Sequence, residues 1–468
     1  MIKSKFIALY QSLNKSEHKL LLKWVDSPIH NQHLIVQKLF IYLSKRSKIN
    51  KTTVAKNRIF KHLFPQQKYN DAQLRHIQSY ALEVLENFVG YNQALSNQLT
   101  FKKNQLEVYQ ARKLQKLSQQ TLKKIDKQLA QSSLENGAHH LMAYEVEIER
   151  FKLGSIEHRT QNNNLPQLFN HLSQFYIIST LKYACTAASH RNVYNINYNI
   201  PLLDAVLEYA KNATNSYVIK IYYYAYLALN QPKEEKHYQS LKDYFFEHSQ
   251  LLNKEEQYEV FQLTINYCIK QLNMGNTIYF EEVFELYKKG LESKILFIQG
   301  TLSRFTYKNI VSAGLKLGQF DWVKSFIKDY TTFLPTVFQN NYQHYNTAKL
   351  MFVQNYYDQA LKLLLQVEDY DDLFLTLDAK MMLLKIYYEE DSFDALNALI
   401  ISFKTFLQRK DVMGYHKQVY QNILRLMNKL LGIPLQDQVA KEELKKEIET
   451  TQPLVERQWL LDQLQQIK

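Results

Sequence analysis

The clearest fold signal in the sequence is YQHYNTAKLMFVQNYYDQALKLLLQV, from Tyr342 to Val367. Two apolar patterns at helical spacing lie on either side of a short Tyr-Tyr-Asp turn. Ala348 falls in the first pattern and Ala360 in the second. An alanine lets two helices approach closely, whereas a larger side chain would hold them apart. The stretch therefore predicts a closely packed pair of antiparallel helices.

The same pattern recurs on both sides of this stretch. Counting 35 residues on from Ala360 reaches Ala395 in SFDALNALI, and counting 37 back reaches Val323 in QFDWVKSFI. A period of about 20–50 residues is typical of proteins that stack one structural unit on the next. The predicted units cover about 304–337, 341–374 and 376–409.

These units resemble the tetratricopeptide repeat (TPR), and the resemblance is clearest over about 304–409. Pro335 lies where that repeat usually has proline, whereas Val311 and Leu383 replace the small residue of its first helix. A fainter helix pair covers about 216–248. The resemblance implies an all-α fold: an α-solenoid of TPR-like antiparallel helix pairs, with a concave groove for peptides or protein surfaces.

The composition of the 468-residue chain favours long helices over folds that need glycine. There are 10 Gly and 8 Pro, roughly 2% each, against usual values of about 7% and 5%. So few glycines argue against all-β folds, Rossmann domains and P-loop enzymes. Gly314 and Gly318 form a G-x-x-x-G spacing within one predicted helix. In this chain the spacing predicts close packing, not a membrane motif.

Charge divides the chain unevenly. Residues 1–130 hold 23 basic and 7 acidic residues, a net charge of +16. The remainder carries −3, so the whole chain has a net charge of +13. We predict a basic helical N-terminal unit at 1–91, a long basic connecting helix at 92–131, a TPR-like α-solenoid at 137–410 and C-terminal capping helices at 411–468. The second region has neither Gly nor Pro up to about residue 130, so it is expected to form one long helix, or two.

Cap residues mark helices in the N-terminal unit. Ser16 is expected to cap a helix that runs to about Asp26. Asn70 or Asp71 is expected to cap another, which ends at a C-cap near Gly90.

The second of these helices follows a predicted helix at about 51–63, and together they form a candidate helix-turn-helix. Arg75, His76 and Gln78 would lie at the start of its recognition helix and contact nucleic acid. The connecting PQQKYN is longer than the usual turn of about three or four residues, which weakens the match.

The basic segment that follows is a second candidate for contact with nucleic acid. Its cations lie beside an apolar stripe and would grip phosphates without sequence preference. They are Lys102, Lys103, Arg112, Lys113, Lys116, Lys123, Lys124 and Lys127. The alternative is that this charge provides solubility and packs against the protein's own acidic solenoid.

Some TPR domains clamp a peptide carboxylate with Lys and Asn on the first helices of successive repeats. In this chain Lys308 and Asn346 match that pattern, and the resemblance extends the candidate peptide groove to neighbours on the same helices. Those neighbours are Asn309, Lys349 and Lys380. However, Ser312, Leu377 and Met381 occupy positions where the pattern has Asn or basic residues. A generic groove for an extended or helical segment is therefore favoured over a carboxylate clamp.

The sequence contains no recognised catalytic or cofactor motif. G-x-x-x-x-G-K-[ST], G-x-G-x-x-G, H-E-x-x-H and G-x-S-x-G are all absent. His139 and His140 precede Glu145 and Glu149, but neither histidine lies one helical turn from a carboxylate. We therefore expect no catalytic residue, no metal and no cofactor, and a protein that is not an enzyme.

No segment has the length and hydropathy of a membrane span, and the N-terminus lacks the apolar core of a signal peptide. Cys185 and Cys268 lie in apolar helical patterns, which favours buried thiols over a disulfide. These features predict a cytoplasmic protein that does not associate with membranes.

Taken together, the patterns predict a protein–protein interaction scaffold of TPR-like type that binds a protein or peptide partner. The alternative is a nucleic-acid-binding or transcription-regulatory protein, in which the basic N-terminal 130 residues bind nucleic acid and the solenoid senses a signal or binds a partner.

Overall fold

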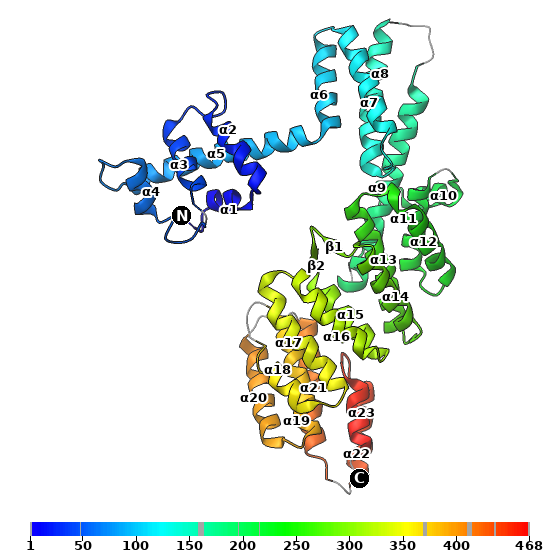
Figure 1. Cartoon of the computed structure of the whole chain (residues 1–468). Coiled ribbons are helices and arrows are strands. Elements are labelled where there is room, and N and C mark those ends of the chain that lie inside the picture. The colour runs from blue at the N-terminus through cyan, green and yellow to red at the C-terminus, as the bar shows by residue number, and fades with distance from the viewer. Residues whose placement is uncertain are drawn as a thin grey trace. The chain divides into compact units, whose positions relative to one another are not determined.

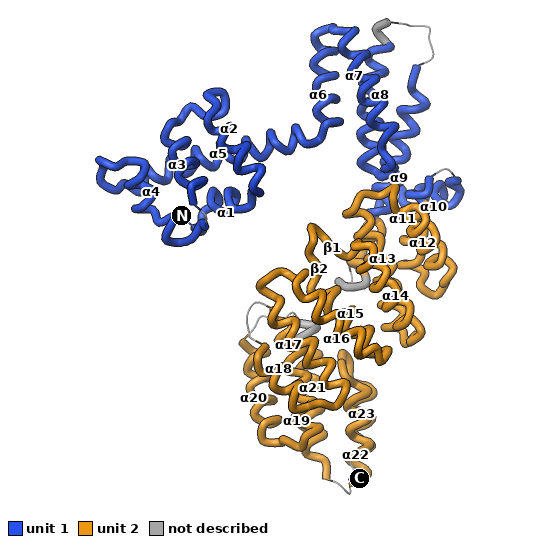
Figure 2. The backbone as a smooth tube through the Cα atoms, viewed as in Figure 1, with its two compact units in different colours: residues 1–183, 200–219 blue, residues 184–199, 220–468 orange. Residues whose placement is uncertain are grey.

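The described residues of the computed structural model are all-α, apart from one short hairpin (Figure 1). The structure describes residues 2–46, 48–157, 163–194, 196–214, 216–367, 372–409, 414–434 and 437–466. The chain divides into two compact units (Figure 2). The first comprises Met1–Tyr183 and Ile200–Ile219, and the second comprises Ala184–Asn199 and Lys220–Lys468.

The first unit begins with five helices around one apolar core. They are α1 (Lys5–Ser12), α2 (Lys15–Asp26), α3 (Leu34–Ser44), α4 (Lys56–Leu63) and α5 (Asp71–Ser96). The core draws on all five helices, and α5 packs against each of the other four. Residues 64–70 connect α4 to α5.

Caps explain two differences from the sequence prediction in this region. Asn14, not Ser16, caps α2, because Asn14 and Glu17 form a reciprocal capping box. Asn70 caps α5 as expected. However, α5 continues through Gly90 to Ser96, because Gly90 keeps helical geometry there and does not act as a C-cap.

Five more helices follow: α6 (Gln98–Ala111), α7 (Gln115–Ala130), α8 (Gly137–Glu157), α9 (Leu165–Tyr194) and α10 (Leu203–Asn212). Helices α6, α7 and α8 pack against one another around Leu106, Leu122, Ile125 and Val146 (Figure 1). Of the two alternatives predicted for 92–131, one long helix or two, the structure matches the second. The segment holds the end of α5 and two further helices, because the chain turns at Asn97 and again at Lys113.

The second unit begins near the end of α9. Its first part contains α11 (Tyr217–Asn230), α12 (Glu235–His248), η1 (Ser249–Leu251), α13 (Lys254–Asn273), α14 (Tyr279–Glu292), β1 (Phe297–Ile298) and β2 (Thr301–Leu302). The two strands form an antiparallel hairpin in which Phe297 pairs with Leu302. Cys185 and Cys268 are buried free thiols, as the sequence predicted.

The rest of the second unit contains α15 (Arg304–Lys316), α16 (Phe320–Tyr330), η2 (Thr331–Phe333), α17 (Thr336–Val353), α18 (Tyr357–Leu364), α19 (Leu373–Glu389), α20 (Phe393–Arg409), α21 (Gly414–Leu431), α22 (Gln438–Thr450) and α23 (Arg457–Gln466). Each helix from α15 to α23 packs against the next in sequence. In addition, α17 packs against both α15 and α19. Helices α21 to α23 share one apolar core with α19 and α20, and the predicted boundary at 410 and 411 lies outside the described residues.

One turn geometry recurs in three successive helix pairs, α15–α16, α17–α18 and α19–α20. Gly318, Asn355 and Asp391 each follow the first helix of a pair in the left-handed conformation. In each case the next backbone N–H donates to the carbonyl five residues earlier, as in a Schellman motif. The turns are spaced by 37 and 36 residues.

This spacing corrects the alignment of the third unit. Val323 and Ala360 lie five residues after their turns and are fully buried. The residue five after Asp391 is Leu396, which is also fully buried, whereas Ala395 is exposed. The second helix of that pair therefore presents Leu396 to its partner.

The two glycines of the G-x-x-x-G spacing have different roles. Gly314 lies inside α15, where an added Cβ would be 2.5 Å from a methyl carbon of Val323 in α16. Gly318 lies beyond the end of α15 and has a φ of +67°, so it forms the turn and takes no part in close packing. Close packing is thus confirmed for one glycine of the pair.

Candidate functional site

The five residues of the predicted peptide groove lie on three helices of the second unit. Lys308 and Asn309 belong to α15, Asn346 and Lys349 to α17, and Lys380 to α19. Because α17 packs against both α15 and α19, these helices bring part of the set together.

Lys308 and Lys349 are the two members of the set that form one polar cluster. Lys308 forms an ion pair with Asp378 of α19, and both side chains are about one quarter exposed. The Lys349 ammonium donates to Ser312 Oγ of α15 at 2.7 Å. Ser312 in turn donates to the carbonyl of Lys308 at 2.8 Å. We call Lys308, Ser312, Lys349 and Asp378 the α15–α17–α19 cluster.

Two cations and two carboxylates lie close enough to Lys349 to affect its pKa. Lys349 has a pKa lowered to about 8, mainly by burial, and the Lys308 and Lys385 ammonium groups contribute to the lowering. Asp378 and Glu456 oppose this shift. Lys385 is itself paired with Glu456 at 2.9 Å. A carboxylate brought to this cluster would favour the charged form of Lys349.

Asn346, three residues before Lys349 in the sequence, is fully buried. Its Nδ2 donates to the carbonyl of Tyr342 at 2.7 Å, and its Oδ1 is buried without a hydrogen-bond partner. The other two groove residues have separate contacts: exposed Asn309 hydrogen-bonds with Tyr287, and Lys380 lies over the Phe406 ring at 5.3 Å.

Positions that depart from the TPR carboxylate clamp have structural contacts of their own. Leu377 and Met381 are buried in the apolar core that α19 shares with the C-terminal helices. Ser312 accepts the hydrogen bond from Lys349. These positions therefore supply no basic group to the face of α15 and α17.

Sequence reasoning missed the acidic partners of this region. Asp378 pairs with Lys308, and Asp372 accepts from the Tyr342 hydroxyl at 2.6 Å and lies 3.4 Å from the Arg304 guanidinium. The available signal was the position of Asp378 on the first helix of its unit, two residues before Lys380. Reading it required the contacts among three helices.

In the first unit, the predicted recognition residues lie near the start of α5. Arg75 is exposed and forms an ion pair with Asp71 at 3.0 Å. His76 is exposed, and Gln78 is partly buried with an unpartnered Nε2. Whether this helix enters a groove of nucleic acid stays a prediction.

The basic residues of α6 and α7 fall into two groups. Lys102 donates to Gln128 at 2.9 Å, and Lys103 pairs with Glu145 at 3.0 Å and with Glu107 at 3.5 Å. The second group is exposed, and no carboxylate in the described ranges pairs with any of its members. It consists of Arg112, Lys113, Lys116, Lys123, Lys124 and Lys127.

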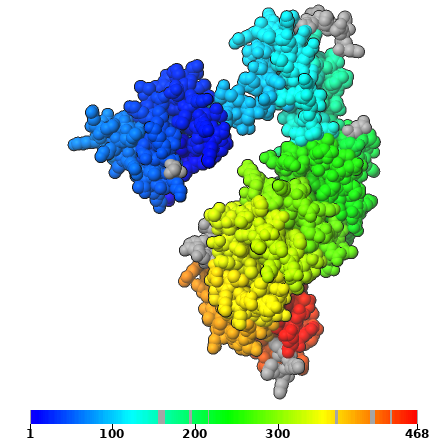
Figure 3. Space-filling view, in the orientation of Figure 1, coloured from blue at the N-terminus to red at the C-terminus, as the bar shows by residue number. Residues whose placement is uncertain are grey.

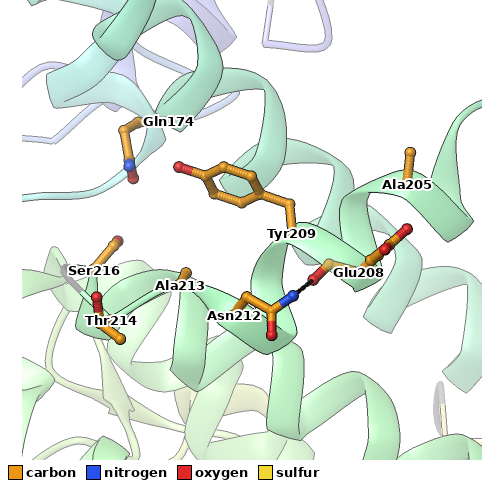
Figure 4. A pocket seen from close by; sticks show the side chains of 8 residues that line it. All are labelled: Gln174, Ala205, Glu208, Tyr209, Asn212, Ala213, Thr214 and Ser216. Atoms are coloured by element: carbon orange, nitrogen blue, oxygen red, sulfur yellow. Dashed lines mark hydrogen bonds between the residues drawn. The ribbon is translucent and has the colours of Figure 1, made fainter.

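A pocket of about 500 Å³, which no sequence pattern indicated, lies in the first unit between α9 and α10 (Figure 4). Gln174 and Tyr209 face each other across the pocket, and the Oε1 of Gln174 is buried without a partner. Asn212 donates to the carbonyl of Glu208 at 3.3 Å along one wall.

Histidines form a second polar contact in this unit. The Nδ1 atoms of His140 in α8 and His171 in α9 lie 3.0 Å apart. His140 has a pKa lowered to about 4, mainly by burial, and nearby His139 and His171 contribute to the lowering. No group of three or more histidine, cysteine or acidic residues in the described ranges is arranged to hold a metal ion.

None of the described helices combines the length and hydropathy of a bilayer-spanning segment.

Known proteins offer no guide to the function of either candidate surface. No family model matches the chain, and no curated protein or solved structure shows significant similarity to it.

Proposed function

We propose that the protein is a non-enzymatic interaction scaffold, in which TPR-like helix pairs α15 to α20 bind a segment of a partner protein. The observation that carries this proposal is the α15–α17–α19 cluster, in which the partly exposed Lys308 and Lys349 are held by Asp378 and Ser312. The repeated turns, spaced by 37 and 36 residues, support a stack of similar helix pairs.

The proposed partner segment carries acidic side chains. Lys308 and Lys349 are partly exposed, and each keeps a flexible ammonium group that can exchange an internal contact for one with a ligand. A carboxylate near Lys349 would also offset the burial that lowers the pKa of this lysine.

Affinity purification from native cells tests this function first. The full-length chain is used as bait with nuclease treatment, so that partners held through nucleic acid are removed. The recovered protein is then purified and titrated against the wild type, against Lys308→Ala/Lys349→Met and against the control Lys324→Ala/Lys362→Ala. The control lysines are exposed on α16 and α18, outside the cluster.

The cluster variant is expected to bind the partner at least tenfold more weakly, and the control is expected to match the wild type. Equal affinity of the cluster variant and the wild type would remove these lysines from the binding site. Loss of all protein partners after nuclease treatment would argue against a protein scaffold.

A further inference from the structure

Helix α7 carries a row of exposed lysines that is directed away from the bundle core. Lys116, Lys123 and Lys127 are spaced by seven and four residues, which are about two turns and one turn of an α-helix, so they lie along one side. Exposed Gln120 lies on the same side. We call these three lysines and Gln120 the lysine face.

The core of the bundle fixes the direction of this face. Ser118, Thr121, Leu122 and Ile125 are the buried residues of α7, and they occupy the opposite side of the helix. Leu122 and Ile125 pack with Leu106 of α6 and Val146 of α8. Packing therefore holds the lysine face toward solvent. The light-blue to cyan segment that includes α6 and α7 is visible in Figure 3.

The carboxylates of this bundle pair elsewhere. Asp126, the single acidic residue of α7, binds Arg150 of α8 at 2.6 Å. Glu107 and Glu145 bind Lys103. In the described part of the bundle, none of the ion pairs includes a residue of the lysine face. The positive charge of the face is thus available to a partner.

We propose that the lysine face binds the phosphate backbone of double-stranded nucleic acid without reading its bases. From Lys116 to Lys127 the face extends about 16 Å, which spans about five phosphates along one strand of a duplex. Lysine ammonium groups and the amide of Gln120 are donors that suit phosphate oxygens. This surface lies outside the cluster of the proposed scaffold and is independent of it.

The chemistry of the face favours a duplex over other polyanions. Helix α7 contains no aromatic residue on which the bases of a single strand would stack. The face itself carries no apolar side chain to insert into a lipid headgroup layer. Exposed Lys124, Arg112 and Lys113 lie close by in sequence and extend the positive charge beyond the face.

Fluorescence anisotropy with the full-length chain and labelled 24-base-pair DNA of mixed sequence tests the proposal. Three lysine–phosphate contacts give an expected slope of about −2.7 for log affinity against log salt, which is roughly a 40-fold loss from 50 to 200 mM KCl. A second duplex of unrelated sequence is expected to bind equally well.

Three variants separate the lysine face from net charge. Lys116→Gln/Lys123→Gln/Lys127→Gln is expected to bind at least tenfold more weakly at 50 mM KCl and to reduce the slope by about 2.7. The matching arginine triple should keep wild-type affinity. Lys324→Gln/Lys328→Gln/Lys362→Gln removes the same charge from exposed sites on α16 and α18 and should stay within twofold of wild type.

The proposal is overturned if the wild type does not bind the duplex at 50 mM KCl, or if the two glutamine triples bind equally. It is also overturned if single-stranded DNA, polyglutamate or vesicles with 30% phosphatidylserine compete better than unlabelled duplex. Circular dichroism of each variant should match the wild type, because all the substituted side chains are exposed.

Discussion

Lys349 of α17 donates a hydrogen bond of 2.7 Å to Ser312 of α15, so a lysine with a pKa lowered to about 8 links two neighbouring helices. Ser312 also donates to the carbonyl of Lys308, which pairs with Asp378. The link therefore passes from α17 through α15 to α19. The charge state of one ammonium group is thereby coupled to the packing of three helices.

The lowered pKa of Lys349 predicts a distinctive titration. Competitive reductive methylation across pH 6.5–11, analysed by mass spectrometry, should give a midpoint near 8 for Lys349. Exposed Lys324 provides the matched control. A midpoint for Lys349 equal to that of the control would contradict the burial described for it.

The same shift predicts how stability depends on pH. The folded-state pKa lies below the unfolded value, so the unfolded chain binds more protons between about pH 8 and 10.4, and stability rises across this window. Lys349→Met should flatten that rise, by about 1–2 kcal/mol after allowance for partial exposure. Urea unfolding at several pH values measures the effect, and an unchanged rise in the variant would rule out Lys349 as its source.

Asp378 pairs with Lys308 and favours the charged form of Lys349. Asp378→Asn should lower the midpoint of Lys349 below 8, because this carboxylate favours the charged lysine. It should also destabilise the second unit by about 1–2 kcal/mol, since Lys308 loses its ion-pair partner. Methylation and urea unfolding report the two effects separately. Asp394→Asn, at an exposed site on α20, is the control.

The contact between His140 and His171 predicts sensitivity to acid in the first unit. The pKa of His140 is about 4 in the folded state, below the usual value of about 6.5, so stability is lost as pH falls from 6.5 toward 4. His140→Gln should reduce that loss by about 1–2 kcal/mol, whereas His76→Gln, at an exposed site, should not. Hydrogen exchange of α8 and α9 amides at pH 4.5 and 7 measures it. Equal acid sensitivity in both variants would contradict this role.

Two glycines predict opposite effects of alanine. Gly314→Ala places a methyl 2.5 Å from Val323 and should destabilise the second unit by about 1–3 kcal/mol. Gly90→Ala should stabilise α5 by about 0.5–1 kcal/mol, because no atom lies within 4 Å of the added Cβ and glycine weakens helices. Thermal unfolding followed by hydrogen exchange distinguishes the two units. Destabilisation by both substitutions to the same extent would show that close packing is not the cause.

Local signals in the sequence located much of the fold. Asn70 capped α5 as expected, and the spacing from Ala360 led to Val323, which is buried five residues after its turn. The third unit was misaligned by one residue, because its turn comes 36 residues after the preceding one and places Leu396, not Ala395, in the core.

Long-range pairing set the limit of prediction for the candidate sites. Lys103 was grouped with the other cations of 92–131, but its partner Glu145 is on α8, more than 40 residues away. The break at Lys113 carried no glycine or proline signal, because a lysine adopts the left-handed conformation there. By contrast, Lys308 and Lys349 were correctly placed on first helices of neighbouring units.

Two turns between paired helices are sites where substitution is expected to stabilise the protein. Lys113 and Asp391 occupy left-handed positions beyond a helix end, where glycine is the usual residue, and each costs about 1 kcal/mol of steric strain. Lys113→Gly and Asp391→Gly would relieve that strain without altering a packed side chain. Glycine at these two turns is therefore expected to raise the thermal stability of the chain.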